Sequence, residues 1–596
     1  MRLRARLERD WRFWKGLNRT LKRVKTIAPD SDNLICDDLQ AAAQQWRDRP
    51  ALTFEDKTLT YGEMDAMANR YASWAKSLNL RRGQTVALIM PNRLEYFPIW
   101  YGLSKVGVIT ALINTQLSGP ALAHCLNISG AGHVIVDDET ASAFETAKAL
   151  LEKHTQQWLL GTAHGDQHDL KQALKSCSQL PPDKSAREDM TARDTALYIY
   201  TSGTTGLPKA ARITHARVQT YMRGFAGATG ATDKDRIYVP LPLYHATGGL
   251  CGLGAALLSG GSAVIKARFS ASQFWPDIVA ENCTMFVYIG ELCRYLVNQP
   301  PQPDETRHKL RLAFGNGLRG DVWTEMRARF RLPNILEFYG STEGTVSLFN
   351  WDGKVGAIGR VPKWLAKRFN VRLIQFDVET DQPVRGLNGL CLQAGLGQVG
   401  ECIGQIGGVE GGSDYTGYVD KKASELKVLR DVFARGDAWF RTGDLMKTDA
   451  DGYFYFIDRI GDTFRWKGEN VSTAEIEALL QAAPGVREVD VYGVEVPGTE
   501  GRAGMAALVV DPEFDLVAFG DYVGRDLPSF ARPVFLRLLP VIETTGTFKH
   551  RKMDLVTDGF NPKVVKDPLF RKTTAGAYEV LSQGDFTKIS NGKAKL

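Results

Sequence analysis

The 596-residue sequence lacks the cysteine and histidine clusters that hold structural metals. Its eight cysteines are scattered, and no Cys-x-x-Cys pair occurs among them. Scattered cysteines exclude a zinc ribbon and a disulfide-stapled scaffold, and they are typical of a reducing compartment. The nine histidines include no His-Glu-x-x-His motif, so the sequence gives no sign of a zinc protease either.

The sequence also lacks a convincing membrane-spanning run. The best candidate, Gly248 to Ile265, is uncharged over 18 residues but contains six glycines. Those glycines indicate a buried helix–loop–strand segment rather than a lipid-exposed helix. No apolar segment follows the basic N-terminal residues, so a secretory signal peptide is excluded. Peripheral association is therefore the strongest membrane attachment that we expect.

Net positive charge is concentrated at the N-terminus. Residues 1–28 contain ten basic and two acidic residues, a net charge of +8, whereas the whole chain has +6. The rest of the chain is thus slightly acidic, which argues against nucleic acid as a partner. Apolar side chains recur every three or four positions in this segment, at Leu3, Leu7, Trp11, Trp14, Leu17, Leu21 and Val24. The spacing predicts an amphipathic helix.

Three interpretations of this helix stay open. It can lie on an anionic membrane surface, with its aromatic rings among the headgroups and its cations near lipid phosphates. It can instead pack on the body of the protein, or serve as a mitochondrial targeting segment. We favour the membrane surface for residues 1–28, and we expect a cytoplasmic, peripherally membrane-associated protein.

Short apolar strands alternate with helical patterns through much of the chain. The strand Thr85–Met90 precedes a helical stretch at Arg93–Val106, and the strand Gly132–Asp137 precedes one at Thr140–Lys153. Such alternation predicts an α/β fold with largely parallel sheets and helices on their faces. Further strands are expected at Ala196–Thr201, Ala263–Ile265, Thr284–Tyr288 and Arg311–Phe314.

The pattern changes in the last third of the chain. Glycine becomes dense between residues 380 and 415, which predicts short antiparallel strands and turns. A compact α+β segment follows Asp458, with a helix at Thr473–Ala482 and strands at Val489–Val494 and Met505–Val510. We therefore expect an N-terminal helix (1–28), a large domain (29–458) and a small C-terminal domain (459–596).

The most informative segment runs from Tyr200 to Lys209 and follows an apolar strand. Gly203 and Gly206 let the backbone turn tightly and bring N–H groups close to an anion. Lys209 adds a positive charge, and four hydroxyls add neutral donors, on Thr201, Ser202, Thr204 and Thr205. The spacing is not that of a Walker A loop. We predict a phosphate-binding loop, with a polar hairpin turn as the alternative.

This loop resembles the signature of the adenylate-forming superfamily, which contains acyl-CoA synthetases, luciferases and peptide-synthetase adenylation domains. Three further segments are similar and stand in the same order: Tyr339-Gly-Ser-Thr-Glu343, Arg441-Thr-Gly-Asp-Leu445 and Asp458-Arg-Ile-Gly-Asp462. Finer matches resemble the fatty acid transport proteins, also called very-long-chain acyl-CoA synthetases. They are Pro242–His245, Tyr288–Tyr295, Gly315–Arg319, Phe464–Ser472, Tyr492–Gly504 and Thr545–Lys549.

The resemblance implies an ATP-dependent long- or very-long-chain fatty acid:CoA ligase. Such an enzyme transfers AMP to a fatty acid carboxylate, releases diphosphate and passes the acyl group to CoA. The implied fold is a large domain with mixed and parallel sheets flanked by helices, a distorted antiparallel β subdomain and a small mobile α+β C-terminal domain. ATP, CoA and Mg2+ would be its ligands, with a fatty acid as the substrate.

The resemblance also assigns phosphate and metal contacts. Thr201 to Lys209 would hold the β- and γ-phosphates, with Thr205 as a catalytic contact. Glu343 would bind Mg2+, which suits a hard ion that prefers carboxylate, phosphate and water oxygens. Further contacts to the nucleotide are expected at Tyr200, Gly340, Ser341 and Thr342.

The nucleoside contacts come from three parts of the chain. Tyr339 would stack on adenine, opposite a wall formed by Gly315, Asn316 and Gly317. Asp444 would accept hydrogen bonds from both ribose hydroxyls. Arg459 would contact the ribose or the α-phosphate.

The C-terminal domain is expected to rotate between the two half-reactions about a hinge at Asp458. One orientation would bring Lys549 to the α-phosphate, and the other would bring Lys467 and Gly468 to the CoA channel. The superfamily usually has glycine directly before the catalytic lysine, whereas Thr-Phe precedes Lys549. Arg551 and Lys552 therefore remain alternatives.

The acyl site is expected at His245, Tyr288 and Gly290, where His245 would orient the carboxylate or gate the pocket. No dedicated base is required, because a fatty carboxylate is already ionised near pH 7. Two other functions stay open: a fatty acid transporter independent of ligation, and an acyl-AMP ligase for a carrier protein. Ala594-Lys595-Leu596 resembles a peroxisomal targeting tripeptide, which has that meaning only in a eukaryote.

Overall fold

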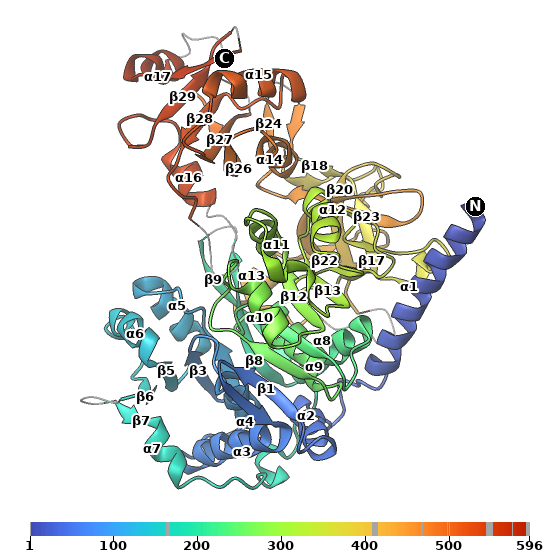
Figure 1. Cartoon of the computed structure of the whole chain (residues 1–596), viewed down its shortest axis with the longest axis vertical. Helices are drawn as coiled ribbons and strands as arrows, with labels where there is room; N and C mark the ends of the chain where they lie inside the picture. Colours follow the sequence, from blue (N-terminus) through green and yellow to red (C-terminus); the bar gives the residue numbers. More distant parts are fainter. Residues whose placement is uncertain are drawn as a thin grey trace.

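The structure is a computed structural model (Figure 1). It describes residues 2–162, 167–203, 206–378, 380–407, 415–466, 469–497, 499, 501–543, 552–574 and 576–591. The predicted site residues Thr204, Thr205, Lys467, Gly468 and Lys549 lie outside these ranges, as do Arg551 and the terminal tripeptide Ala594-Lys595-Leu596.

Two largely parallel sheets form the first part of the chain. The eight-stranded sheet has the order β15 (Ser347–Asn350), β14 (Ile335–Gly340), β13 (Leu312–Asn316), β12 (Met285–Ile289), β10 (Arg236–Val239), β11 (Ser262–Ile265), β1 (Pro50–Phe54), β2 (Lys57–Thr60). The seven-stranded sheet has the order β7 (His168–Asp169), β6 (Gln156–Leu160), β5 (His133–Asp137), β3 (Thr85–Ile89), β4 (Ile109–Leu112), β8 (Thr195–Gly203), β9 (Gly206–Thr214). Antiparallel pairs lie at their edges, so the predicted α/β alternation is confirmed.

One hydrophobic core joins these two sheets, with helices on their faces. α4 (Tyr96–Ser104) is buried on every side, as expected for a helix with apolar residues all round. α6 (Ala141–Lys148) ends earlier than predicted. The other helices of this part are α2 (Ile35–Gln45), α3 (Tyr61–Ser77), α5 (Gly119–Ser129), α7 (Leu170–Lys175), α8 (His215–Thr229), α9 (Leu253–Leu257), α10 (Phe274–Ala280), α11 (Gly290–Val297) and α12 (Gly320–Arg329).

An antiparallel sheet follows where glycine becomes dense, as predicted. Its order is β16 (Gly359–Arg360), β23 (Tyr453–Arg459), β22 (Ala438–Thr448), β20 (Gly400–Gln405), β17 (Val371–Ile374), and β21 (Val428–Arg430) also pairs with β22. The ribbon of β18 (Phe376–Asp377) and β19 (Gln382–Pro383) and the short helix α13 (Lys421–Glu425) complete this part. The sheet has its own small hydrophobic clusters.

The C-terminal domain has a separate hydrophobic core and lies at one end of the molecule (red, Figure 1). Its five-stranded sheet has the order β26 (Val486–Glu495), β27 (Arg502–Val510), β28 (Phe535–Leu538), β29 (Leu569–Lys572), β30 (Tyr578–Val580). A ribbon of β24 (Phe464–Trp466) and β25 (Glu469–Val471) precedes it. Its helices are α14 (Thr473–Gln481), α15 (Leu516–Asp526), α16 (Lys552–Asp558) and α17 (Gln583–Ser590). The boundary between residues 458 and 459 stays a prediction.

The N-terminal segment forms the helix α1 (Arg2–Val24), which runs along the side of the large domain (Figure 1). The predicted helix is therefore confirmed, but four large side chains of its apolar stripe are exposed: Leu7, Trp11, Trp14 and Leu21. Trp11 and Trp14 are 56% and 52% exposed, while Phe13 between them is fully buried. In the described part of the chain, no helix combines the length and the hydropathy needed to cross a membrane.

Candidate active site

The predicted phosphate loop lies at the tip of the β8–β9 hairpin, at the edge of the seven-stranded sheet. Ser202 and Gly203 end β8, and Gly206 begins β9. Thr201 stands opposite Lys209 in this hairpin, so a hydroxyl and an ammonium group share one position along the ladder. The described part of the predicted loop thus belongs to two adjacent strands, and Thr204 and Thr205 between them lie outside the described residues.

Tyr200 belongs to the support of this loop. It is buried, and its hydroxyl donates a hydrogen bond of 2.8 Å to the Cys125 carbonyl on α5. Burial raises the pKa of Tyr200 well above its ordinary value, which keeps the hydroxyl neutral. Its predicted contact with the nucleotide remains a prediction.

Glu343 follows β14 and is nearly buried, at 8% exposure. The Tyr418 hydroxyl donates a 2.7 Å hydrogen bond to its Oε1 atom. Tyr418 reaches this position because its backbone pairs with Ala211 on β9, and its ring lies 5.9 Å from the Lys209 ammonium. The carboxylate predicted to bind Mg2+ therefore stands beside the hairpin predicted to bind phosphate.

The loop around Glu343 is held by a buried cation. Arg217 on α8 donates from Nε to the Thr342 carbonyl at 2.8 Å and from Nη2 to the Ser341 carbonyl at 3.2 Å and the Gly344 carbonyl. These carbonyls converge on one guanidinium, which fixes the backbone on both sides of Glu343. Ser341 and Thr342 thus use their carbonyls for the support of the loop, and Gly340 ends β14 just before it.

Three predicted nucleoside contacts come together from three strands. The Tyr339 hydroxyl on β14 donates a hydrogen bond to Asp444 on β22. Arg459 on β23 lies directly opposite Asp444 in the β22–β23 ladder, with Arg459 Nε 4.0 Å from Asp444 Oδ1. Burial and the Asp444 carboxylate raise the pKa of Tyr339 well above its ordinary value, so its hydroxyl stays a neutral donor.

The predicted adenine wall is a close backbone contact. A Cβ atom on Gly290 would lie 1.8 Å from the Gly317 carbonyl oxygen, and one on Gly315 would lie 2.1 Å from the Tyr288 carbonyl oxygen. Gly317 itself has φ of 81°, a conformation that favours glycine. Packing therefore requires glycine at positions 290 and 315, whereas the backbone conformation favours it at 317, and Gly290 contacts the wall. Its role in acyl binding stays a prediction.

Glu337 supports this wall from inside the protein. Its Oε1 accepts from the Leu318 amide at 3.0 Å, and its Oε2 lies 2.5 Å from the Tyr288 hydroxyl oxygen. Burial raises the pKa of Glu337 to about 8, although these hydrogen bonds oppose the shift. Tyr288 is fully buried in this contact, so its predicted role in the acyl pocket is not tested by its position.

His245 stands between β10 and a π-helix at Thr247–Gly252. Short π-helical segments are often found at functional sites. The ring centroids of His245 and Tyr244 are 4.6 Å apart, and Thr247 Oγ1 is 3.5 Å from Asn316 Oδ1. The predicted carboxylate-orienting residue therefore lies close to the predicted adenine wall.

Comparisons with known proteins agree with this arrangement. The family described as "AMP-binding enzyme" matches residues 39–401, and the one described as "AMP-binding enzyme C-terminal domain" matches residues 475–549. Long-chain fatty acid transport protein 2 of Rattus norvegicus is 41% identical over 92% of this chain and 89% of its own length. Long-chain fatty acid transport protein 1 of Homo sapiens is 40% identical over 94% of this chain and 87% of its own length. The chain belongs to the fatty acid transport protein family of AMP-binding enzymes.

Solved structures confirm the adenylate-forming fold of this family member. The anthranilate CoA ligase AuaEII in complex with anthranoyl-AMP has a TM-score of 0.76 at 20% identity, covering 89% of this chain and 98% of that chain. A Mycobacterium tuberculosis fatty acyl CoA synthetase has a TM-score of 0.60 at 26% identity, covering 88% of this chain and 98% of that chain. The expected large domain, antiparallel sheet and separate C-terminal domain are all present.

The predicted hinge residue, Asp458, forms hydrogen bonds with the C-terminal domain. Asp458 is buried, and its Oδ2 accepts a 2.7 Å hydrogen bond from the Thr473 amide at the start of α14. Its Oδ1 accepts from the Arg459 amide at 2.9 Å. A carboxylate at a helix N-terminus is favourable, because the first N–H groups of a helix have no partner within it.

Lys552, one of the alternatives for the catalytic cation, is engaged inside the C-terminal domain. Its Nζ lies 2.7 Å from Glu477 and 3.5 Å from Asp490, and it donates to Thr473 Oγ1 at 3.0 Å. Burial by itself would lower the pKa of Lys552, but the carboxylates of Glu477 and Asp490 raise it. Lys552 therefore stays charged within a partly buried ion pair with Glu477.

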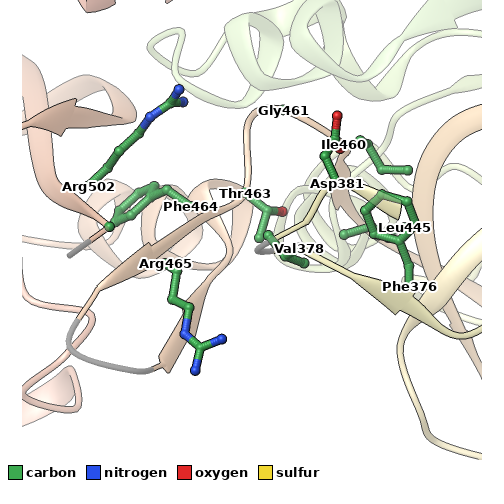
Figure 2. A pocket seen from close by; sticks show the side chains of 11 residues that line it. Phe376, Val378, Asp381, Leu445, Ile460, Gly461, Thr463, Phe464, Arg465 and Arg502 are labelled. Atoms are coloured by element: carbon green, nitrogen blue, oxygen red, sulfur yellow. The ribbon is translucent and has the colours of Figure 1, made fainter. Parts of the chain in front are cut away.

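A cavity of about 510 Å3 lies between the antiparallel sheet and the C-terminal domain. Figure 2 shows Phe376 and Leu445 on one side and Phe464 and Arg502 on the other. Leu445 follows Asp444 directly in β22, so this cavity begins beside the predicted ribose site. The segment predicted to reach CoA follows Arg465, which also lines the cavity.

Sequence reasoning missed three supporting residues: Arg217, Glu337 and Tyr418. Glu337 carries a usable signal, because a carboxylate within the apolar strand Ile335–Gly340 demands an internal partner. Arg217 and Tyr418 carry none, since each acts on a loop far away in the sequence.

Proposed function

We propose that this protein is an ATP-dependent long-chain fatty acid:CoA ligase that acts through an acyl-adenylate. The observation that carries the proposal is the convergence of Tyr339, Asp444 and Arg459 beside the loop that holds Glu343. The residues that would contact the nucleoside thus include Tyr339 near the end of β14, and Glu343, which would bind the metal, follows this strand in the next loop. The names of the curated relatives support a long-chain fatty acid as the substrate.

The proposed reaction has two balanced steps. A carboxylate oxygen attacks the α-phosphorus of ATP, the bond to the β-phosphate breaks, and diphosphate leaves. The CoA sulfur then attacks the acyl carbonyl, and AMP leaves as the acyl–oxygen bond breaks. Catalysis requires mainly positioning and neutralisation of charge, since both reactants of the first step are anions.

The residues of the hairpin and of the Glu343 loop fit the first step. Lys209 and the hydroxyls from Thr201 to Thr205 would bind the β- and γ-phosphates, and Glu343 would hold Mg2+. Mg2+ is usually bound by one or two carboxylates together with phosphate oxygens, so a single nearly buried glutamate suits it. When bound, the ion would neutralise phosphate charge.

The side chains around adenosine would set its orientation. Tyr339 would pack against adenine while its hydroxyl keeps Asp444 aligned for the ribose. Arg459 would contact the ribose or the α-phosphate, and Gly315 to Gly317 would form the facing wall. His245 would orient the fatty acid carboxylate near Asn316.

The C-terminal domain would contribute Lys549 to the first step and Lys467 with Gly468 to the second. We prefer Lys549 to Lys552, because Lys552 is already paired with Glu477 and Asp490. The guanidinium groups of Arg465 and Arg502 beside the cavity suit the phosphates of CoA.

The test uses purified protein with Mg2+, ATP and a panel of C8 to C26 fatty acids. We expect fatty-acid-dependent exchange of labelled diphosphate into ATP, and stoichiometric AMP and acyl-CoA when CoA is added. No exchange with any acid would refute adenylate formation. Exchange without thioester would favour an acyl-AMP ligase for a carrier protein.

The relatives are named as transport proteins, so uptake is a second candidate function. Ligation itself favours net entry, because an acyl-CoA is trapped on the side where it forms. Protein reconstituted with liposomes is expected to accumulate fatty acid only when ATP and CoA are supplied. Accumulation without them would show transport independent of ligation.

A further inference from the structure

The helix α1 is attached to the large domain by polar and small residues and by the fully buried Phe13, whose ring centroid lies 5.3 Å from that of Trp351. Asp10 pairs with Arg360 at 2.5 Å, and Arg9 pairs with Asp451 at 2.9 Å. Gly16 lies so close to the Trp351 ring that a Cβ atom would be 2.4 Å from it. This half of the helix is held by charge pairing and close backbone packing.

Contacts along the second half of α1 hold the same side of the helix against the large domain. A Cβ atom on Gly227 of α8 would lie 2.7 Å from the Thr20 Cα, so the two helix backbones nearly touch. Arg19 donates to the Ala228 carbonyl at 3.2 Å, and Arg23 donates to the Leu258 carbonyl at 2.8 Å. The helix is thus anchored along its length, and its outward face is defined.

The outward face is the apolar one. Its four large side chains are 49–63% exposed: Leu7, Trp11, Trp14 and Leu21. At 1.5 Å per residue they extend over about 21 Å of helix. A helix on a globular protein normally buries its apolar stripe, and a contiguous exposed one marks an interaction surface.

Cations border this stripe. The Lys15 ammonium lies 5.0 Å from the Trp11 ring, and Arg6, Lys22 and Lys25 are exposed. The segment of residues 1–28 has a net charge of +8, although the rest of the chain is slightly acidic. Tryptophan and flanking cations together suit the headgroup layer of an anionic bilayer, where rings enter and cations meet phosphates.

We propose that the outward face of α1 docks this protein on an anionic lipid bilayer. Leu7, Trp11, Trp14 and Leu21 enter the headgroup layer, while Asp10 and Arg9 keep the helix attached to the large domain. The attachment makes the contact rigid, so the enzyme body is held in one orientation on the membrane. This inference does not depend on the proposed ligase reaction.

The test measures co-sedimentation of the full-length protein with sucrose-loaded vesicles. One set is pure phosphatidylcholine, and the other contains 30% phosphatidylglycerol. We expect binding to the anionic vesicles to be at least tenfold tighter and to weaken as salt rises, since each cation near an anionic surface contributes roughly fivefold. The double variant W11A/W14A is expected to lose at least tenfold of that binding.

A control replaces two leucines far from α1 in the sequence, Leu180 (75% exposed) and Leu426 (76%), by alanine; both are more exposed than Trp11 and Trp14. L180A/L426A is expected to bind vesicles like the wild type, and both double variants should keep wild-type melting temperatures, because the replaced side chains are exposed. Equal vesicle binding by W11A/W14A and wild type would overturn the proposal. So would a wild-type protein that ignores anionic vesicles but self-associates through Trp11 and Trp14 in sedimentation equilibrium.

Discussion

Replacing Glu337 by glutamine tests the internal support of the adenine wall. Burial raises the pKa of Glu337 from 4.5 to about 8. A carboxyl group with a raised folded-state pKa stabilises the protein fully below pH 4.5, and this stabilisation is lost as pH rises through 8. Between pH 6 and pH 9 the loss amounts to about 3 kcal/mol, because the unfolded chain is already ionised throughout that range.

Glutamine is neutral at every pH and keeps an acceptor for the Leu318 amide. We therefore expect the apparent Tm of wild type to fall by about 3 °C more than that of E337Q between pH 6 and pH 9, given the unfolding entropy of a large domain. Differential scanning fluorimetry across this range measures the difference. The KM for ATP of E337Q should stay near that of wild type at pH 7, since the Leu318 contact is kept.

Two further variants sharpen this experiment. Glu325 is exposed on α12, so E325Q should follow the wild-type pH profile. E337A leaves the Leu318 amide and the Tyr288 hydroxyl without this partner, and each lost hydrogen bond costs about 1–3 kcal/mol. E337A should therefore lower Tm at every pH and raise the KM for ATP. Parallel Tm profiles for E337Q and wild type would refute the reasoning.

Four other substitutions test the rest of the site. Tyr339→Phe keeps the ring but removes the hydrogen bond to Asp444, so the KM for ATP should rise roughly 2- to 10-fold, and an unchanged KM would contradict the assigned contact. Tyr418→Phe should raise the Mg2+ concentration needed for half-maximal diphosphate exchange by roughly tenfold, because it removes the hydrogen bond that orients the metal ligand. Lys549→Met should slow adenylation by roughly a hundredfold or more without changing Tm. Lys552→Met should instead lower Tm, because it leaves the Glu477 carboxylate without its ion-pair partner. The reverse pattern would make Lys552 the catalytic cation.

Much of the fold follows from sequence periodicity. The strand predicted at Thr85–Met90 is β3, because a strand buried on both faces appears in the sequence as a continuous apolar run. The helix predicted at Thr473–Ala482 is α14, because its apolar residues recur with a helical repeat. The orientation of α1 could not be predicted. Its stripe shows that one face is apolar, but which face meets the protein depends on Gly16, Gly227 and Arg360, whose contacts are not local.

The candidate site also contains residues that the sequence predicts and residues that only the structure reveals. Tyr339, Asp444 and Arg459 lie in separate motifs, and the structure brings them together across β14, β22 and β23. Arg217 and Tyr418 position Glu343 through carbonyl and hydroxyl contacts that leave no local pattern. Residues predicted to touch ligands can thus be picked out from motifs, whereas the residues that hold them in place are seen only in the fold.

The hydrogen bonds of the Asp458 carboxylate constrain the predicted rotation of the C-terminal domain. The carboxylate accepts a hydrogen bond from the first turn of α14. Its own strand, β23, pairs with β22, and just beyond β23 the Ile460 amide donates to the Gly443 carbonyl at 2.9 Å. Any rotation of the C-terminal domain must either break the hydrogen bond between Asp458 and α14 or move the end of β23 with the domain. Gly461, at φ of 96°, is the first residue beyond the ladder with the backbone freedom to act as a pivot. A pivot at Gly461 would lie three residues past Asp458, the residue whose carboxylate holds the start of α14.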